Sequence, residues 1–359
     1  MMLKFKKFFH FSISFLVIIT LFEFYFRVMG ISLPSFVYDD RDLGRTHKAG
    51  REIFSASAEG FCIDEVNNFG YTGIGYPPSK KPGTIRIALF GSSYIEGLQV
   101  FRRNRFSIIF EKQINNFSDT NIEVLNFAIG GDDFRGMFFR YLKFSDIYNT
   151  DYNLFFIQNQ ALIKNKTIPS PEIFFKDDSI YISGKYLLDN ETKLRQTFSF
   201  IRNSSVGNLF KEGFEVYYSG RLGKIVFDKL WSYDNNIMER GLSECDNFYD
   251  LNLRIFNSLN KENEKGLENI LVLMDSVDIY YADYLKNLNI PIINLSEKLN
   301  SYDYEELHFW KASGKIGHWN NFAHNVVGYS LANEFEKFIK NENKLLTRIN
   351  QENHDKNHK

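Results

Sequence analysis

Two residues near the ends of apolar runs have the types needed for nucleophilic catalysis. Ser93 closes the segment Gly91-Ser92-Ser93, which follows an apolar run. A serine at a strand-to-helix turn exposes its hydroxyl, so Ser93 is the candidate nucleophile. His318 lies in Gly317-His318-Trp319-Asn320, just before an amphipathic stretch. Histidine is the commonest general base, so His318 is the candidate partner of Ser93.

Two further segments could stabilise a developing negative charge. Gly130-Gly131 and Gln158-Asn159 also close apolar runs. A glycine lets its backbone N–H approach a substrate, and an asparagine side chain offers a further donor. The N–H groups of Ser93 and Gly131 with the amide of Asn159 therefore form a candidate oxyanion hole.

Each of these residues also has a simpler interpretation. Ser93 could cap the following helix, because serine is favoured at helix N-caps. Gly131 could be a turn glycine, Asn159 could bond loop backbone, and His318 could be an exposed loop histidine. Their order along the chain favours the catalytic interpretation of Ser93 and His318, whereas for Asn159 both interpretations stay open.

An α/β pattern supplies the elements that would position these residues. Apolar runs predict buried strands at 85–90, 124–129, 154–157, 270–274 and 290–293, and helical periodicity predicts helices at 104–115, 135–147 and 323–340. Strands that alternate with helices pair in parallel through right-handed crossovers. The carboxyl ends of such strands meet at one edge of the sheet, where ligands bind.

In this order, the segments resemble the conserved blocks of the SGNH/GDSL hydrolase family. The matching segments are Ile87–Ser93, Val124–Gly131, Ile157–Asn159 and Gly317–Asn320. The resemblance implies a three-layer α/β/α sandwich with a parallel, flavodoxin-like sheet. It also implies acyl-ester chemistry in which Ser93 attacks, His318 takes the proton, and Ser93, Gly131 and Asn159 hold the oxyanion.

The sequence departs from the family pattern at two places. Ser92 stands where the family has the aspartate of Gly-Asp-Ser, and no aspartate precedes His318. The second loss matters more, since losing the aspartate of a serine-protease triad lowers kcat by roughly 10⁴. Three outcomes stay open: a Ser-His dyad with weak hydrolysis, a distant acid such as Asp303 or Glu306, or a degenerate site.

The first thirty residues predict a membrane anchor. Lys4, Lys6 and Lys7 precede an uncharged run from Phe8 to Phe22, and helix can continue to Gly30. No small-residue cleavage site follows, so an uncleaved signal anchor is expected. The lysines place the N-terminus in the cytoplasm, and the body then lies on the periplasmic or extracellular side.

The rest of the chain divides by its patterns. Residues 31–83 look like a loop-like linker that ends in a Pro/Gly/Lys cluster, and residues 84–340 form the predicted hydrolase-like domain. Residues from about 160 to 265 interrupt the α/β pattern as an insertion, which begins with a β-hairpin around Asp177-Asp178 and is largely helical from about 195. Residues 341–359 form a polar tail.

Charge and cysteine spacing argue against a nucleic-acid partner and against a zinc or redox site. The formal net charge is −1, which argues against a nucleic-acid partner. The only cysteines are Cys62 and Cys245, which fit no zinc or redox spacing and could pair or stay as separate thiols. We expect no metal or cofactor. Asp275 and Asp278 are read as solvated loop carboxylates, and His324 as a structural residue at a helix start.

These expectations lead to one enzymatic and one non-enzymatic hypothesis. An outward-facing member of this family would hydrolyse or transfer O-acyl groups, such as acetyl, on a cell-surface or secreted glycan or a small ester. The alternative is an inactive relative that binds glycan or acts as an envelope scaffold. The missing acid before His318 is the main support for that alternative.

Overall fold

The computed structural model describes most of the chain. The described residues are 2–29, 36–40, 44–57, 59–118, 120–163, 172–176, 179–183, 204–207, 209, 242–276, 279–311 and 313–357. Most of the predicted insertion lies outside these residues, including most of residues 195–241 in the helical stretch expected from about 195 to 265, and Asp278 lies outside them as well.

A parallel sheet of five strands forms the centre of the domain. Its strands are β5 (Thr84–Phe90), β6 (Asn121–Asn126), β7 (Tyr152–Ile157), β10 (Glu268–Leu273) and β11 (Ile292–Asn294). Every neighbouring pair runs parallel, and the spatial order is β11-β10-β7-β5-β6. In chain order this is the flavodoxin-like arrangement 2-1-3-4-5 read from the other edge. The predicted fold class, an α/β fold with a parallel, flavodoxin-like sheet, is confirmed.

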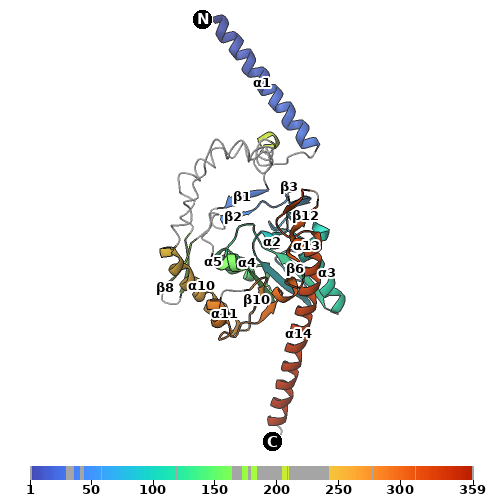
Figure 1. Cartoon of the computed structure of the whole chain (residues 1–359), viewed down its shortest axis with the longest axis vertical. Helices are drawn as coiled ribbons and strands as arrows, with labels where there is room; N and C mark the ends of the chain where they lie inside the picture. The colour runs from blue at the N-terminus through green and yellow to red at the C-terminus, as the bar shows by residue number, and fades with distance from the viewer. Residues whose placement is uncertain are drawn as a thin grey trace.

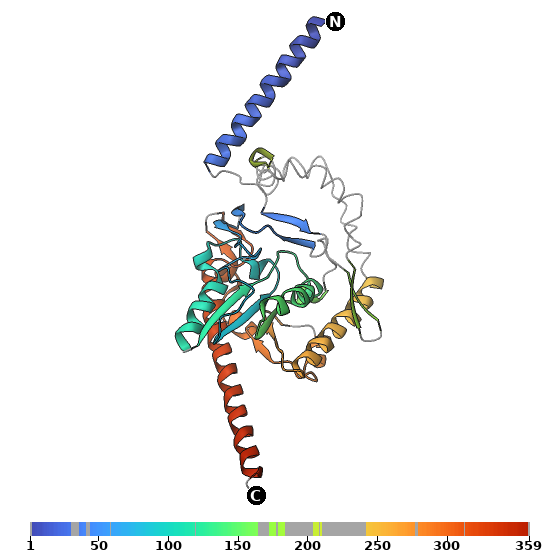
Figure 2. The ribbon, with the colours of Figure 1, turned by 180° about the vertical axis from the view of Figure 1, so that it is seen from behind.

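Helices cover both faces of this sheet, as Figures 1 and 2 show. Along β5, Ile87 and Leu89 point into the core shared with α3 (Phe106–Phe117) and α14 (Asn321–Asn357). Ala88 and Phe90 point into the opposite core, with α4 (Phe134–Tyr148) and α10 (Leu242–Asn263). Successive side chains of a strand face opposite sides, and both sides here are apolar, which is why β5 reads as a continuous apolar run.

Shorter elements connect these layers. They are α2 (Ser93–Glu96), the 3₁₀ turn η1 (Arg102–Asn104), α5 (Asn159–Ile163), α11 (Ile279–Leu285), α12 (Ser296–Leu299), α13 (Tyr304–His308), β12 (Phe309–Trp310) and β13 (Lys315–Ile316). Strands β12 and β13 form a small antiparallel hairpin just before His318.

The N-terminal segment, residues 36–83, is more ordered than the predicted linker. It contains two antiparallel hairpins, β1 (Val37–Asp40) with β2 (Gly44–His47) and β3 (Glu52–Ser57) with β4 (Gly60–Glu65). Two-stranded ribbons need no continuous apolar run and are stabilised by packing on the rest of a domain. Their sequences therefore lack the strong strand signal of the central sheet.

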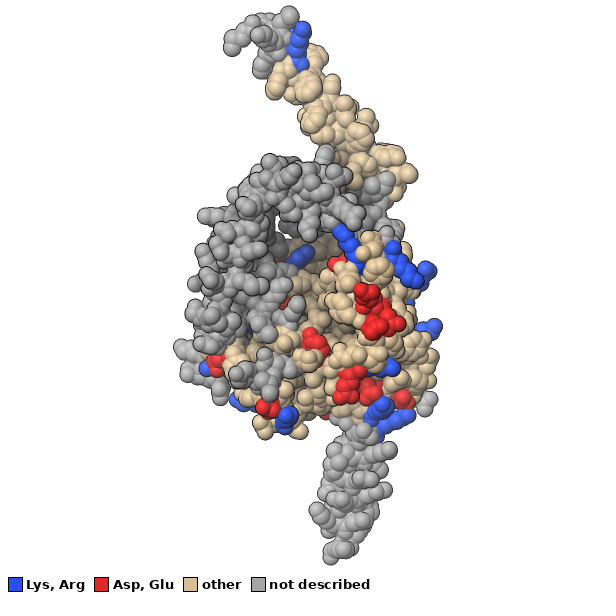
Figure 3. Space-filling model, in the orientation of Figure 1, with Lys and Arg blue, Asp and Glu red and all other residues tan. Residues whose placement is uncertain are grey.

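The predicted N-terminal helix is present as α1 (Met2–Val28). Within it, Lys6–Val28 is long and apolar enough to cross a membrane by length and composition. Figure 3 shows this helix uncharged over most of its visible length, with basic side chains near its N-terminal end. Arg27 Nε donates to Glu23 Oε1 at 2.7 Å, as expected from their spacing of four residues.

Two other regions bear on the sequence predictions. Strands β8 (Glu172–Lys176) and β9 (Ser179–Ser183) pair antiparallel, which confirms the hairpin predicted around Asp177-Asp178.

Helix α14 continues to Asn357, beyond residue 340, where the polar tail was expected to begin. Figure 1 shows its far end leaving the domain on the side opposite to α1.

Candidate active site

Ser93 lies where β5 turns sharply into α2. Gly91 allows this turn, because a Cβ at that position would lie 2.2 Å from Ile95 Cγ1. Ser92 holds the N-cap position without a side-chain capping bond, and Ser93 begins the helix. The simpler interpretation of Ser93 as the helix cap is therefore wrong, and its hydroxyl is free to point into the site.

His318 approaches Ser93 from the loop before α14. Its Nε2 lies 2.8 Å from Ser93 Oγ, although the two residues are 225 positions apart in sequence. Two contacts orient the histidine: Trp310 Nε1 donates to the His318 carbonyl oxygen at 2.9 Å, and the Tyr94 ring lies 4.7 Å from the imidazole, centroid to centroid. The imidazole is 29% exposed, so a substrate can reach it.

A carboxylate that the sequence analysis missed completes the arrangement. Glu59 Oε2 bonds to His318 Nδ1, and it also accepts the backbone N–H of His318 at 3.0 Å. A carboxylate only accepts when ionised, so this bond places the proton on Nδ1 and leaves Nε2 to receive the proton of Ser93. Ser93, His318 and Glu59 thus have the connectivity of a catalytic triad.

Glu59 sits in the turn of the β3–β4 hairpin, upstream of the sheet. Gly317 makes room for it, because a Cβ there would lie 2.4 Å from Glu59 Cδ. Gly60 allows the hairpin to lie close to the domain, since a Cβ at that position would lie 2.2 Å from the Gln99 carbonyl oxygen. The only local sequence signal was Gly60 between two short strand-like runs, since glycine is common at and beside hairpin turns.

Buried charges fasten this hairpin to the domain. Asp64, on β4, lies 2.6 Å from Arg105 Nη1, and these side chains are 3% and 1% exposed. Arg102 pairs with the other oxygen of Asp64. Arg105 also donates to the Gly97 carbonyl oxygen at 2.9 Å, at the end of α2. The element that carries Glu59 is therefore tied to the helix that begins with Ser93.

The oxyanion-hole candidates follow the neighbouring strands. Gly130 donates its N–H to Glu96 Oε2 at 2.9 Å, so that donor is already used. Gly131 has φ +89°, a conformation that favours glycine, and it follows directly. A Cβ on Gly130 would lie 3.5 Å from Ser93 Cβ, so this loop packs against the serine. The structure therefore leaves Gly131, rather than Gly130, as the candidate N–H of this loop.

Asn159 is placed at the same edge by its backbone. It begins α5 directly after β7, and its N–H donates to Asp275 Oδ1 at 2.9 Å. Asp275 follows β10 and is half-buried rather than solvated, which corrects the expectation for this residue. Its burial raises the pKa of the Asp275 carboxyl above its usual range.

A buried pair of side chains, Glu96 and His47, holds the Gly130 loop in place. Glu96, three residues after Ser93, accepts the Gly130 N–H with one oxygen and lies 2.6 Å from His47 Nε2 with the other. The His47 and Glu96 side chains are 1% and 8% exposed. His47 ends β2, so the N-terminal segment contacts the site through His47 as well as Glu59.

Other polar residues singled out in the sequence have structural contacts. Asp303 and Glu306 form the capping box of α13, so these candidate acids serve that helix instead of His318. His324 is structural, as expected: its Nδ1 accepts the Phe106 N–H at 3.3 Å, and burial lowers its pKa to about 3.

Cys62 is a free thiol whose Sγ lies 3.2 Å from Arg105 Nη2. Among the described residues, no group of three or more His, Cys, Asp or Glu side chains could hold a metal ion.

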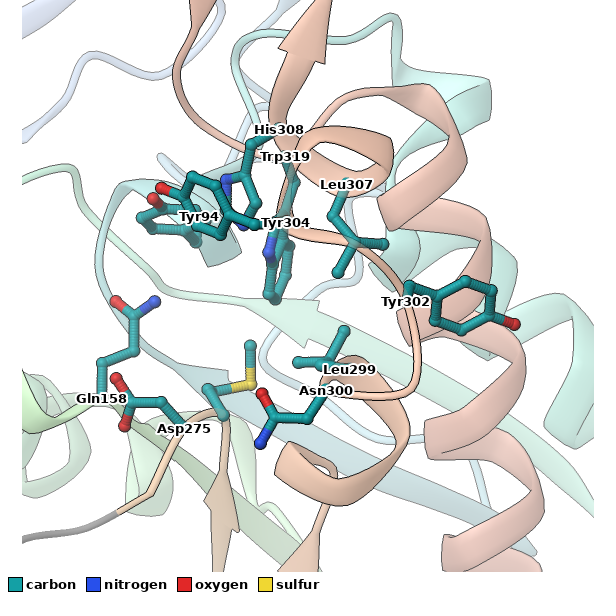
Figure 4. A pocket seen from close by; sticks show the side chains of 11 residues that line it. Tyr94, Gln158, Asp275, Leu299, Asn300, Tyr302, Tyr304, Leu307, His308 and Trp319 are labelled. Atoms are coloured by element: carbon teal, nitrogen blue, oxygen red, sulfur yellow. The ribbon is translucent and has the colours of Figure 1, made fainter.

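A cavity of about 400 Å³ is lined by the sequence neighbours of Ser93 and His318 (Figure 4). Tyr94, which follows Ser93, and Trp319, which follows His318, both line it. The other lining residues are Gln158, Met274, Asp275, Leu299, Asn300, Tyr302, Tyr304, Leu307 and His308. Its volume lies in the range of small-molecule sites, roughly 300–1,000 Å³.

Comparison with known proteins gives matches among solved structures. No family model matches the chain, and no curated protein matches it in sequence. The structures similar to it include a protein assigned to the lipolytic G-D-S-L family from Desulfitobacterium hafniense, at 11% identity and TM-score 0.34 over 69% of this chain and 98% of that one. A lipase/acylhydrolase from Enterococcus faecalis matches at 13% identity and TM-score 0.34 over 70% and 96%. An acetyl xylan esterase matches at 12% identity and TM-score 0.34 over 69% and 98%.

Proposed function

We propose that this protein is a membrane-anchored, SGNH-type serine ester hydrolase or O-acyltransferase that uses Ser93, His318 and Glu59. The observation that carries the proposal is the bonded series from Ser93 Oγ through His318 to Glu59. Its members come from three distant parts of the chain, and a structural role requires no such alignment. The cavity beside the serine supports the proposal, because it offers space for a substrate.

The geometry supports a two-step acyl transfer. Ser93 Oγ attacks the ester carbonyl carbon while His318 Nε2 takes its proton, and Glu59 stabilises the resulting imidazolium through Nδ1. The N–H groups of Ser93 and Gly131 and the Asn159 amide are the proposed donors to the oxyanion. Ser93 is the first residue of α2, so its N–H has no partner within that helix.

The second half of the reaction restores the serine. His318 gives its proton to the leaving alcohol as the carbon–oxygen bond breaks, which leaves an acyl group on Ser93. Water, or a hydroxyl of an acceptor, then attacks this acyl group while His318 takes the proton of the attacking group. Hydrolysis and acyl transfer therefore use the same residues and differ only in the attacking hydroxyl.

The membrane helix supports a substrate outside the cytoplasm. With Lys6 and Lys7 at its N-terminal end, α1 would hold the catalytic domain on the outer side of a bacterial cytoplasmic membrane. An O-acylated cell-surface or secreted glycan is the proposed substrate there. Protease added to intact spheroplasts should digest the domain, and full protection would contradict this topology.

The inactive-scaffold alternative loses its main support. That hypothesis rested on the absence of an acid for His318, and Glu59 provides one. A fluorophosphonate ester probe separates the two functions, because it labels only an activated serine. We expect one adduct per chain, mapped to Ser93 by peptide mass analysis and absent from Ser93→Ala. A folded wild-type protein that stays unlabelled would favour the scaffold.

A further inference from the structure

The cavity beside Ser93 and His318 has one aromatic wall. Tyr94, Tyr304, His308 and Trp319 present their rings on the same side of it, as Figure 4 shows. The Tyr304 and His308 rings stack with centroids 4.1 Å apart. Tyr94 and Trp319 pack edge to face at 5.2 Å. Because these rings pack against one another, the wall is a preformed apolar surface.

The opposite wall carries three polar side chains beside the apolar Met274 and Leu299. Gln158 and Asp275 follow β7 and β10, and Asn300 follows α12, so each lies just beyond the end of a regular element (Figure 4). One oxygen of Asp275 accepts the Asn159 N–H at 2.9 Å, which fixes the carboxylate in place. The two amides offer both donors and acceptors, and the carboxylate is an acceptor.

His308 adds an acceptor to the aromatic wall. Its Nδ1 lies 2.7 Å from the Gly317 carbonyl oxygen. A carbonyl oxygen only accepts, so Nδ1 carries the proton in this bond. Burial lowers the pKa of His308, so the ring is neutral at neutral pH and its Nε2 is left as an acceptor.

We propose that this cavity binds a pyranose ring, as the alcohol half of the ester that Ser93 cleaves or forms. A pyranose presents C–H groups on its faces and hydroxyls around its rim. One face can lie on the aromatic wall while the hydroxyls bond to Gln158, Asp275 and Asn300. The inference rests on the proposed function, because it assigns the alcohol half of that reaction.

An acyl chain fits the cavity less well. It offers no hydrogen bonds, so its burial would remove water from Gln158, Asp275 and Asn300 without replacing the lost bonds. The cavity volume of about 400 Å³ is near the lower end for small-molecule sites, which suits one sugar ring with its substituent.

The position of His318 places the alcohol half on this side. His318 must give its proton to the leaving alcohol, and its ring lies 4.7 Å from that of Tyr94, which lines the cavity. Trp319, the next residue, lines the cavity as well. On this proximity we place the ester oxygen that receives the proton on the side of the cavity.

Paired substrates test this assignment on the full-length protein in detergent. One substrate is a methyl pyranoside carrying a single O-acetyl group, and the other is cyclohexylmethyl acetate, which has the same acyl group but no ring hydroxyls. We expect kcat/KM for the sugar ester to exceed that for the cyclohexyl ester at least tenfold. Asn300→Leu should bring this ratio close to one, whereas Asn325→Leu, at an exposed position on α14, should leave it as in wild type.

A binding measurement separates failure of this assignment from failure of the proposed function. Saturation-transfer NMR with unacetylated methyl pyranosides on the Ser93→Ala variant needs no turnover. Binding that is lost in Ser93→Ala/Asn300→Leu supports the sugar subsite even where no ester is hydrolysed. A preference for cyclohexylmethyl acetate, a ratio unmoved by Asn300→Leu, or no pyranoside binding to Ser93→Ala would each overturn it.

Discussion

The edge of the sheet and the N-terminal segment contribute to the site in different ways. The sheet edge supplies Ser93, Gly131 and Asn159, each a few residues after the end of a strand of the parallel sheet. The N-terminal segment, residues 36–83, supplies Glu59 and His47 from hairpins that precede the first strand of that sheet. The nucleophile thus belongs to the fold, whereas the acid that orients the base is brought by a separate element packed on it.

This difference also explains what the sequence could predict. Buried parallel strands read as short apolar runs, so β5, β6 and β7 and the residues after them were found. Topology then required their ends to share one edge. His318 was found because it precedes a strongly amphipathic helix.

The contribution of the N-terminal segment could not be found in the same way. Glu59 lies in the turn of a hairpin whose strands mix polar and apolar residues, and nothing local shows that this hairpin reaches His318. Its placement depends on distant contacts such as that of Asp64 with Arg105. An acid was expected just before His318. The residues there instead form the β12–β13 hairpin, from which Trp310 donates to the His318 carbonyl oxygen.

The largest effect should come from breaking the contact between serine and histidine. Ser93→Ala and His318→Ala should each lower kcat for 4-nitrophenyl acetate by roughly 10⁶, because the triad acts as a unit. The double variant should be little slower than either single variant. Additive losses in kcat, measured by steady-state hydrolysis on proteins with unchanged circular dichroism, would show that the two residues do not act together.

Removing the acid should have the next largest effect. Glu59→Gln keeps the size of the side chain but loses the charge that stabilises the His318 imidazolium, so kcat should fall by roughly 10⁴. Glu52→Gln, on the same hairpin and exposed, is the matched control and should keep wild-type kcat. An active Glu59→Gln enzyme would reduce the site to a Ser-His dyad.

Loosening the hairpin should lower activity without touching the triad itself. Asp64→Ala leaves the Arg105 guanidinium buried without its carboxylate, and breaking such a buried pair costs about 3–5 kcal/mol. We expect a lower melting temperature and a lower kcat. Asp283→Ala, which removes an exposed pair with Lys286, should change either quantity little, since exposed pairs contribute about 0–1 kcal/mol. Wild-type activity in a folded Asp64→Ala variant would show that the hairpin is held by other contacts.

The smallest effect concerns a further contact between the two regions. Tyr76, in the N-terminal segment, donates to Glu111 Oε1 on α3 at 2.6 Å. Burial raises the pKa of the Glu111 carboxyl to about 7 from 4.5. Between these values the unfolded chain loses the proton first, so the free energy of unfolding should fall with rising pH, by about 3 kcal/mol in total, and level off above the folded pKa.

Urea titrations across this pH range measure that slope. Glu111→Gln cannot ionise, so its free energy of unfolding should lose this part of the pH dependence. A slope that is the same in wild type and Glu111→Gln would assign the pH dependence to other groups.

The bond between Glu59 and His318 can be observed directly by proton NMR. In ¹⁵N-histidine-labelled protein, the Nδ1–H proton of His318 should resonate far downfield, because it is hydrogen-bonded to a carboxylate. The signal should be absent from His318→Ala, move strongly upfield in Glu59→Gln, and stay in place in Asp303→Asn. A His318 signal that moves in Asp303→Asn but not in Glu59→Gln would contradict the account, because the acid would then come from the segment before His318 and not from the N-terminal hairpin.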